Sequence, residues 1–296
     1  MSTNYTISQY DTKYDNITGS GWRYSPLIPG TSINGFIYAN PTDVTFAAHI
    51  KNFIEPCAGA HYYAQGFFNS NYRSASMTVN LNEVEIYRAS NKRNGYICLG
   101  FVSNGSLYRH SDIGLGCTED YTVGNYKRGK WKAFVWGSST TGGDVPWVWT
   151  YGQNYEFHYT DTVRIEMVIT VNGNTHRADC NFYANNNQVA NCYINTTAGQ
   201  MFDVDSGGPK VRFVRFMSLV PIENSPGTKD DKDYTYLKGT IRNLKLGSST
   251  WDYSKIQYAW SVQEDNINDF KLSILNTTSI GTDADSIHIY HDTQTH

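Results

Sequence analysis

The sequence predicts an all-β protein, an antiparallel β-sandwich, and this prediction depends on two observations. Residues 163–171 alternate between apolar and mostly polar side chains, and a period of two is typical of a half-buried strand. Short strand-like runs recur along the chain between turns rich in Asn, Gly and Ser, whereas no segment of about twelve residues shows helical periodicity. Many short strands at regular spacing indicate a sandwich or a barrel.

Two β-hairpins are predicted within residues 155–195. Asn172-Gly173 is a strong signal for a two-residue turn, because both central residues of a type I′ turn need a positive φ. A turn there predicts the pairs Val163–Phe182, Ile165–Cys180, Met167–Ala178 and Ile169–His176. A second turn around Asn185-Asn186-Asn187 predicts the pairs Ala178–Ile194, Cys180–Cys192 and Phe182–Ala190. Both registers place the apolar residues on one face, and a shift by one residue would turn them to the other.

The whole chain, residues 1–296, is predicted to form one domain, because all-β domains of about 200–250 residues are common. Residues 1–35 are polar and rich in Tyr, which indicates an N-terminal arm or an edge strand. Long polar or Gly-rich segments predict loops at 118–145, 196–210 and 221–233. The net charge of −3 argues against a nucleic-acid partner, and no apolar stretch is long enough for a membrane span.

The C-terminal half resembles one known superfamily. Residues 239–246 read G-T-I-R-N-L-K-L, which is similar to the G-x-I-x-x-L-x-L strand near the end of concanavalin A-like lectins and glucanases. The blocks SDIGLG (111–116) and GKWKAF (129–134) also resemble a pair seen in secreted bacterial sandwich proteins of unassigned function. The resemblance covers residues 95–250 and implies a concanavalin A-like jelly roll. It implies a fold rather than a site, because such folds host many functions.

Aromatic residues are the first candidates for a binding site. Trp147, Trp149 and Tyr151 occupy alternate positions, so one strand face would carry three rings. Trp131 and Trp136 lie upstream in a polar, Gly-rich stretch, and we expect them to be accessible. Exposed rings stack on the C–H faces of sugars, while Asn, Asp and Tyr groups bind the hydroxyls. The alternative is that about half of these rings belong to the core, since Trp and Tyr are highly buried on average.

Acidic residues are the second set of candidates. Lectins of the superfamily carry Ca²⁺ near the sugar site, and Asp203-x-Asp205 in a Gly-rich loop could supply two oxygen ligands. The alternative is that these are solvated loop carboxylates. Glu83 and Glu85 would share one face of a strand, but the E-x-D-x-x-E motif of the glucanases lacks its third acid here, because Arg88 stands at that position. A solvent-exposed strand face therefore explains this pair better than hydrolysis.

The cysteines allow two interpretations. Cys180 and Cys192 lie directly opposite one another in the second predicted hairpin, which favours a disulfide in an oxidising compartment. The alternative is a pair of reduced, buried thiols, since directly opposed strand positions often have unfavourable disulfide geometry.

The function predicted from these observations is carbohydrate binding on an aromatic platform, with no cofactor required and calcium as the one candidate. An extracellular or cell-surface location is favoured, although the N-terminus shows no apolar leader. One alternative is a polysaccharide-degrading enzyme, a lyase before a hydrolase, with Arg88, Tyr108, Arg109 and His110 as residues that it would use. The other is a structural or toxin-type surface protein.

Overall fold

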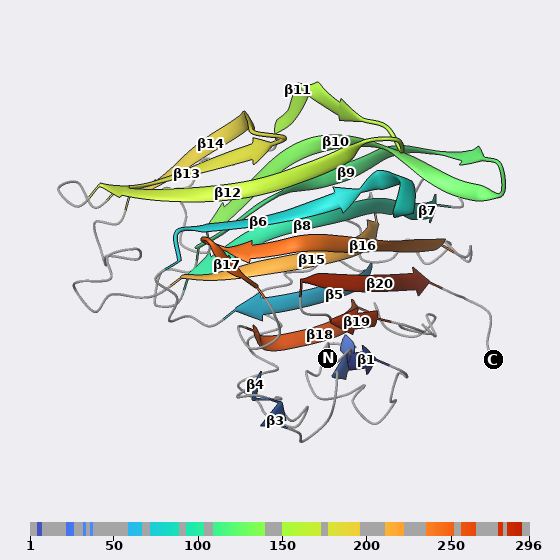
Figure 1. Ribbon diagram of the computed structural model, residues 1–296, viewed down its shortest axis with the longest axis horizontal. Helices are drawn as coiled ribbons and strands as arrows, with labels where there is room; N and C mark the ends of the chain where they lie inside the picture. The colour runs from blue at the N-terminus through green and yellow to red at the C-terminus, as the bar shows by residue number, and fades with distance from the viewer. Residues whose placement is uncertain are drawn as a thin grey trace.

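The computed structural model describes most of the strand-forming sequence. The described residues are 5–7, 22–26, 32–33, 36–37, 59–66, 72–88, 93–103, 109–139, 150–172, 177–195, 211–221, 235–251, 256–264, 278–280 and 283–291. Within them the chain forms β-strands and one 3₁₀ turn, and every strand pair is antiparallel (Figure 1). The predicted all-β antiparallel sandwich is therefore confirmed.

The strands form two large sheets. Sheet A has ten strands; eight follow the order β1 (Tyr5–Ile7), β19 (Thr278–Ile280), β20 (Ala284–His291), β16 (Thr235–Leu246), β6 (Ser74–Asn80), β12 (Thr162–Asn172), β13 (Arg177–Ala184) and β14 (Asn187–Asn195). Two short strands also pair with β16, namely β7 (Glu85–Arg88) and β17 (Ser249–Thr250), and the 3₁₀ turn η2 (Leu81–Glu83) precedes β7.

Sheet B has eight strands. Their order is β11 (Thr150–Phe157), β10 (Tyr126–Ser139), β9 (Arg109–Val123), β8 (Arg93–Ser103), β15 (Val211–Pro221), β5 (Gly59–Gly66), β18 (Ile256–Glu264) and β2 (Trp22–Pro26). A separate ribbon pairs β3 (Ser32–Ile33) with β4 (Phe36–Ile37). Within the predicted N-terminal arm, β1 and β2 thus lie at the outer edges of the two sheets.

The hydrophobic core lies between the sheets. Sheet A contributes alternate residues of β6, β12, β13 and β16, and sheet B contributes alternate residues of β8, β9, β10 and β15. Met167 and Phe182 are fully buried in this core, as the alternation predicts. Burial of each such side chain stabilises the fold by roughly 1.5–3 kcal/mol.

The two predicted hairpin registers have different outcomes. The β13–β14 register is confirmed at Ala178–Ile194, Cys180–Cys192 and Phe182–Ala190, with Asn185 and Asn186 at φ values of 49° and 65° in the turn. The β12–β13 register is wrong by four residues, since Met167 lies opposite Phe182 and Asn172 opposite Arg177. An even shift keeps the same side chains on the core face, so alternation alone could not detect it.

The predicted loop at 118–145 is wrong over its described part. Residues up to 123 and from 126 to 139 form the paired strands β9 and β10, which meet at a turn where Gly124 has a φ of 59°. Figure 1 shows this hairpin projecting beyond the other strands, so its end needs fewer apolar residues than a strand in the core. The predicted loops 196–210 and 222–233 lie outside the described residues, and Pro221 ends β15.

One ion pair links the sheets through the core. Arg215 of β15 binds Asp285 of β20 with two hydrogen bonds of 2.6 and 3.0 Å, and both side chains are fully buried. The guanidinium also donates to the carbonyl of Trp251 at 3.0 Å and lies 4.7 Å from the centre of that indole ring. Asp285 is therefore committed to the core. Removing either partner would leave an uncompensated buried charge.

Candidate functional site

A second buried layer lies on the outer face of sheet B, the face that points away from the core. Most buried hydrophobic residues of the described chain belong to the core cluster, and those that do not are Tyr96, Cys98, Phe134, Val214 and Phe216. Each alternates along its strand with core residues of β8, β10 or β15. Since successive side chains of a strand point to opposite faces, all five face outward.

Two glycines of β9 shape this layer. Gly114 lies opposite Cys98 on one side and Phe134 on the other, and a Cβ there would collide with the Ile97 carbonyl and lie 2.5 Å from Sγ of Cys98. Gly116 lies opposite Tyr96. The absence of side chains at these glycines lets the rings of Tyr96 and Phe134 meet over β9, with centroids 5.1 Å apart in an edge-to-face arrangement.

Asp112 is the next residue of β9 on the same face. It lies opposite Gly100, and a Cβ at Gly100 would collide with Oδ1 of Asp112, so the carboxyl leans over that glycine. Asp112 is only 9% exposed. Among the described residues, no donor or cation binds its carboxyl. We call Tyr96, Gly100, Asp112, Gly114 and Phe134 the Asp112 site.

Burial dominates the electrostatics of this site. It raises the pKa of Asp112 well above its ordinary value of 3.8. It also raises the pKa of the neighbouring Cys98 thiol, and the nearby Asp112 carboxyl raises it further. A buried carboxyl without a partner is costly, and such groups concentrate at functional sites. In its protonated form Asp112 has one O–H donor and remaining acceptor capacity for a ligand.

Solvent reaches this layer only slightly. Tyr96 and Asp112 are each 9% exposed, Phe216 is 6% and Phe134 is 4% exposed, whereas Cys98 and Val214 are fully buried. Asp112 and Tyr96 are therefore the most accessible residues of the layer.

The predicted ligand-binding residues divide into three groups. Trp131 is fully buried in the core beside Cys117, so the expectation that it is accessible is wrong. Strand alternation turns residues 131, 133 and 135 of β10 inward. Trp136 lies opposite Asp112 in the β9–β10 register, and Tyr151 lies opposite Phe134 in the β10–β11 register. Trp147 and Trp149 lie outside the described residues.

Sequence reasoning missed Asp112. The relevant signal was the alternation of Asp112, Gly114 and Gly116 within SDIGLG, which places a carboxyl and two missing side chains on one strand face. A carboxyl beside glycines in a strand indicates a place where another group approaches the backbone closely.

A β-bulge reshapes the outer end of the β9–β10 hairpin. Trp131 lies opposite Cys117 and Lys130 opposite Glu119, so Thr118 is the extra residue. The bulge turns Asp120 to the side of Cys117, where it accepts a 3.0 Å hydrogen bond from Nε of Arg88. Arg88 also donates to the Cys117 carbonyl at 3.1 Å and is buried. Arg88 thus serves an internal network, which leaves it poorly placed for the lyase role considered for it.

The Cys117 thiol next to this network has a raised pKa of about 12. Burial is the main cause, and the positive charge of Arg88 partly opposes it. The thiol donates to the Glu119 carbonyl at 3.3 Å. Because the thiolate is the reactive form of cysteine, Cys117 is a structural residue rather than a nucleophile.

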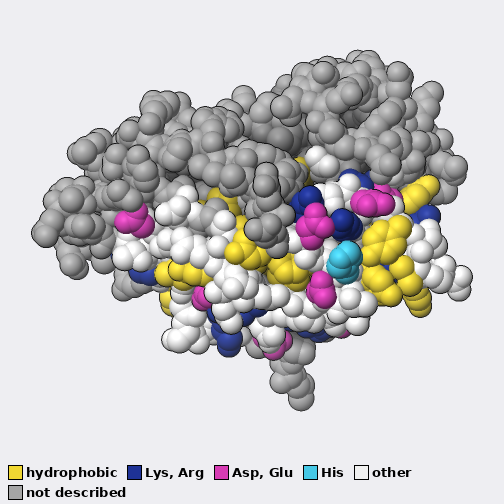
Figure 2. All heavy atoms as spheres, turned by 90° about the horizontal axis from the view of Figure 1, so that it is seen from above, with side chains coloured by type: hydrophobic (Ala, Val, Ile, Leu, Met, Phe, Trp, Pro, Cys, Tyr) yellow, Lys and Arg dark blue, Asp and Glu magenta, His cyan; other side chains and the backbone are white. Residues whose placement is uncertain are grey.

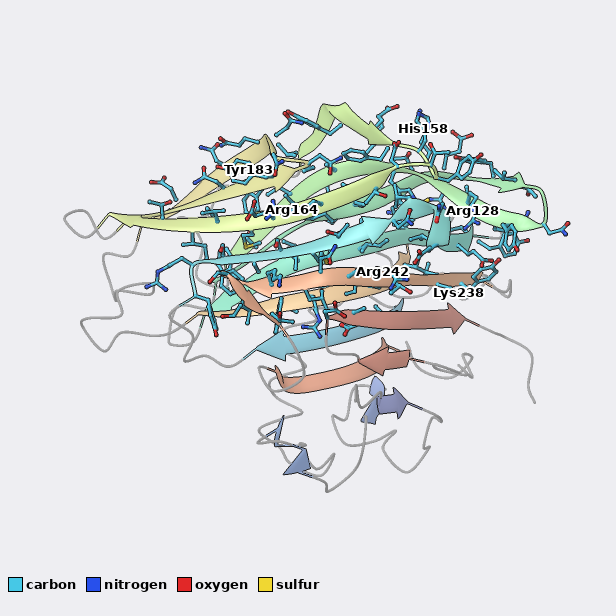
Figure 3. All side chains as sticks on the ribbon, in the orientation of Figure 1. Arg128, His158, Arg164, Tyr183, Lys238 and Arg242 are labelled. Atoms are coloured by element: carbon cyan, nitrogen blue, oxygen red, sulfur yellow. The ribbon has the colours of Figure 1, made fainter. Side chains whose placement is uncertain are left out.

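Glu83 and Glu85 do not form a catalytic pair. Glu83 belongs to η2 and binds Arg242 at 2.6 Å, whereas Glu85 belongs to β7 and binds Lys238 at 3.1 Å. Both cations lie on β16 (Figure 3). The two carboxylates are surface ion-pair partners on the outer face of sheet A.

The predicted disulfide and the predicted calcium site both stay predictions. Cys180 lies opposite Cys192, as predicted, and its side chain is buried. Asp203 and Asp205 lie outside the described residues, and the part of the chain that is described holds no group of three metal-ligating side chains.

The surface of the described part is mixed in charge. Figure 2 shows acidic and basic side chains interspersed with apolar ones and a histidine. No helix in this part of the chain is long and apolar enough to cross a membrane.

The fold and the site define a class: an antiparallel β-sandwich with a buried acid and aromatic rings on one outer face. No family model matches the sequence, and no curated protein matches it. Among solved structures, the chain is similar to the kappa-carrageenase from Pseudoalteromonas carrageenovora, whose structure holds an oligotetrasaccharide of kappa-carrageenan. The identity is 11% and the TM-score is 0.19, over 54% of this chain and 66% of the carrageenase chain, just under two thirds of it. A similarity this low identifies neither a site nor a reaction.

Proposed function

We propose that this protein binds carbohydrate at the Asp112 site on the outer face of sheet B. The observation that carries the proposal is a carboxyl without a partner among the described residues, placed beside two rings that meet over glycines. Sugars present C–H faces that pack on aromatic rings and hydroxyls that exchange hydrogen bonds with a carboxyl. A ligand hydroxyl at Asp112 would offset the cost of burying that group.

The pairing of β10 with β9 and β11 gives a second reason for the proposal. Trp136 occupies the position opposite Asp112, and Tyr151 occupies the position opposite Phe134. Two of the residues predicted to bind ligand thus lie next to the site along neighbouring strands. We infer that these positions extend the aromatic contact to further sugar units.

A glycan array followed by calorimetry tests the proposal with wild-type protein, Trp136→Ala, Asp112→Asn and, as a control on sheet A, Tyr183→Ala. We expect Trp136→Ala to weaken binding about 10- to 100-fold, as expected for loss of one aromatic contact. Asp112→Asn should weaken binding less, because an amide keeps one donor and one acceptor. The proposal fails if wild-type protein binds no glycan at high micromolar concentration, or if Trp136→Ala and Tyr183→Ala bind alike.

Two further expectations belong to this proposal. Repeating the calorimetry with Ca²⁺ and with a chelator tests calcium binding by Asp203 and Asp205, since hard cations prefer carboxylate oxygens. Fractionating the source cells tests an extracellular or cell-surface location.

Degradation of a polysaccharide is the second candidate function, and the raised pKa of Asp112 favours it. A carboxyl that stays protonated at higher pH is suited to general acid catalysis. Incubation with uronate polymers would reveal a lyase by unsaturated product absorbing near ~235 nm, as expected for the conjugated product of proton abstraction and elimination. A reducing-end assay would reveal a hydrolase. Activity that persists in Asp112→Asn would exclude this role for Asp112.

A further inference from the structure

The outer face of sheet B continues along β10 toward the projecting end of the hairpin. Strand alternation places Tyr126, Arg128, Lys130 and Lys132 on the same side of β10 as Phe134. The rings of Tyr121 and Tyr159 meet edge to face at 6.2 Å. The same strand therefore leads from the Asp112 site to a row of cations and tyrosines.

Two lysines of this row share one carboxylate. Nζ of Lys130 and Nζ of Lys132 each lie 2.8 Å from a different oxygen of Glu156. Hydrogen bonds and the charges of these lysines lower the pKa of Glu156 to about 2. Glu156 thus holds two ammonium groups close together, and Glu119 lies opposite Lys130 in the β9–β10 register. Each ammonium also has further N–H donors for a second anion.

Arg128 is held in place at the next position of the row. Its guanidinium lies 4.8 Å from the centre of the Tyr126 ring, and its Nη1 donates at 2.9 Å to the carbonyl of Val84, which precedes β7 of sheet A, so one side of the guanidinium is turned toward sheet A. Tyr126 itself is 53% exposed. A stacked and anchored guanidinium loses less side-chain freedom when it binds an anion.

The charge of the hairpin end is opposite to that of the chain. The cations near its turn are Lys127, Arg128, Lys130 and Lys132, and the carboxylates that face them are Glu119 and Glu156. Asp120 is turned toward Arg88 and neutralised there. The end of the hairpin is therefore positive, whereas the whole chain has a net charge of −3.

We propose that the ligand is an anionic polysaccharide and that Arg128, Lys130 and Lys132 bind its carboxylate or sulfate groups, while the Asp112 site contacts an uncharged part of a sugar. This inference rests on the proposed function and names the substrate class of that surface. Alternate strand positions are about 6.8 Å apart, so the three cations span roughly 13 Å along β10. That length exceeds one monosaccharide and suits a polymer with repeated charges.

The test compares polygalacturonate with its methyl ester, which differ in charge and not in backbone. We expect wild-type protein to bind polygalacturonate more tightly, and this preference to shrink as salt is added. The double variant Lys130→Gln/Lys132→Gln should lose about 5- to 30-fold in affinity for polygalacturonate. The matched control Lys238→Gln/Lys245→Gln, on the outer face of sheet A, should bind as wild type. Circular dichroism verifies that each variant is folded.

The outcomes separate this inference from the proposed function. Equal binding of both polymers, with no effect of the Lys130/Lys132 variant, would overturn the inference and leave carbohydrate binding intact. Tight binding of polygalacturonate that is lost in the lysine variant but kept in Trp136→Ala would support the cation row and contradict the Asp112 site. Equal binding of anionic lipid vesicles or of DNA would overturn a polysaccharide as the specific partner. Binding of neither polymer would overturn the inference, and the glycan array would then decide the proposed function.

Discussion

The outer faces of the two sheets differ in chemistry. Sheet A presents ion pairs between exposed or half-buried side chains, such as Arg164–Glu166 at 2.6 Å, and Figure 3 shows its labelled cations spread from β12 to β16. Sheet B presents buried rings, glycines and the Asp112 carboxyl, which no described residue binds. Sheet A thus has one buried face, as an ordinary sandwich needs, and the described centre of sheet B has two.

This difference between the two outer faces indicates which of them carries the binding site. A solvated face satisfies its charges locally, and the pairs on sheet A do so with Glu166, Glu85 and Glu83. A face that buries an acid without a partner carries a cost that folding alone does not require. We therefore assign binding to the outer face of sheet B.

The largest expected loss of stability comes from truncating a buried ring on the outer face of sheet B. Phe216→Ala should lower the free energy of unfolding by about 3–5 kcal/mol, because it leaves a cavity in a buried layer. Urea denaturation measures this loss. If Phe216→Ala cost no more than an alanine at exposed Lys238, the outer face of sheet B would not be a packed layer.

A smaller loss is expected from filling the space above β9. In Gly114→Ala the new methyl would meet the Ile97 carbonyl and Sγ of Cys98, which should cost about 1–3 kcal/mol. It should also disturb the contact between Tyr96 and Phe134, which near-ultraviolet circular dichroism would report. An unchanged spectrum and unchanged stability would show that the glycine is not needed for this packing.

The Asp112 carboxyl should make stability depend on pH. Its pKa is raised in the folded protein, so its favourable contribution is complete below the ordinary value of 3.8 and is lost as pH rises through the raised pKa. Asp112→Asn cannot ionise, so its stability relative to wild type should increase over that pH range, by about 1.4 kcal/mol per unit of pKa shift. Urea denaturation from pH 3 upward (roughly to pH 8, the usual stable range) measures it. A difference between the two proteins that does not vary with pH would contradict the raised pKa.

The smallest effect is expected on sheet A. Glu166 accepts hydrogen bonds of 2.6 and 2.8 Å from Arg164, but both side chains are only partly buried. Glu166→Gln should therefore cost less than about 1 kcal/mol, and less still at high salt. A loss as large as that of Phe216→Ala would remove the contrast between the two outer faces.

Part of this contrast could be read in the sequence. Strand β12 reads VRIEMVITV, with the alternation of a one-sided strand, whereas β8 and β15 contain the near-continuous apolar runs YICLGFV and FVRFMSLV. Such runs are typical of strands that are buried on both faces. The site itself could not be read so directly, because its parts come from β8, β9 and β10, and only their pairing brings Tyr96 to Phe134.

The predicted ligand-binding residues also show which properties a local sequence pattern reports and which ones depend on strand pairing. Tyr151 was predicted from alternation and Trp136 from the polar composition around it, and both lie beside the site along the strands. Trp131 was assigned from the polar composition around it, but its neighbours in sequence do not report which face of β10 meets the core. The bulge at Thr118 likewise cannot be inferred from a pattern of period two, although it decides that Asp120 meets Arg88.

The sequence by itself determined that the chain forms strands, which residues of β12 and β13 face the core, and how β13 pairs with β14. These properties follow from local alternation and from a short turn, and both lie within a few residues of chain. Only the tertiary structure decided that Arg215 meets Asp285, 70 residues away, and that Asp112 is buried against Gly100. Strand pairing over long separations is fixed by packing of the whole sandwich, and a local pattern has no information about the partner strand.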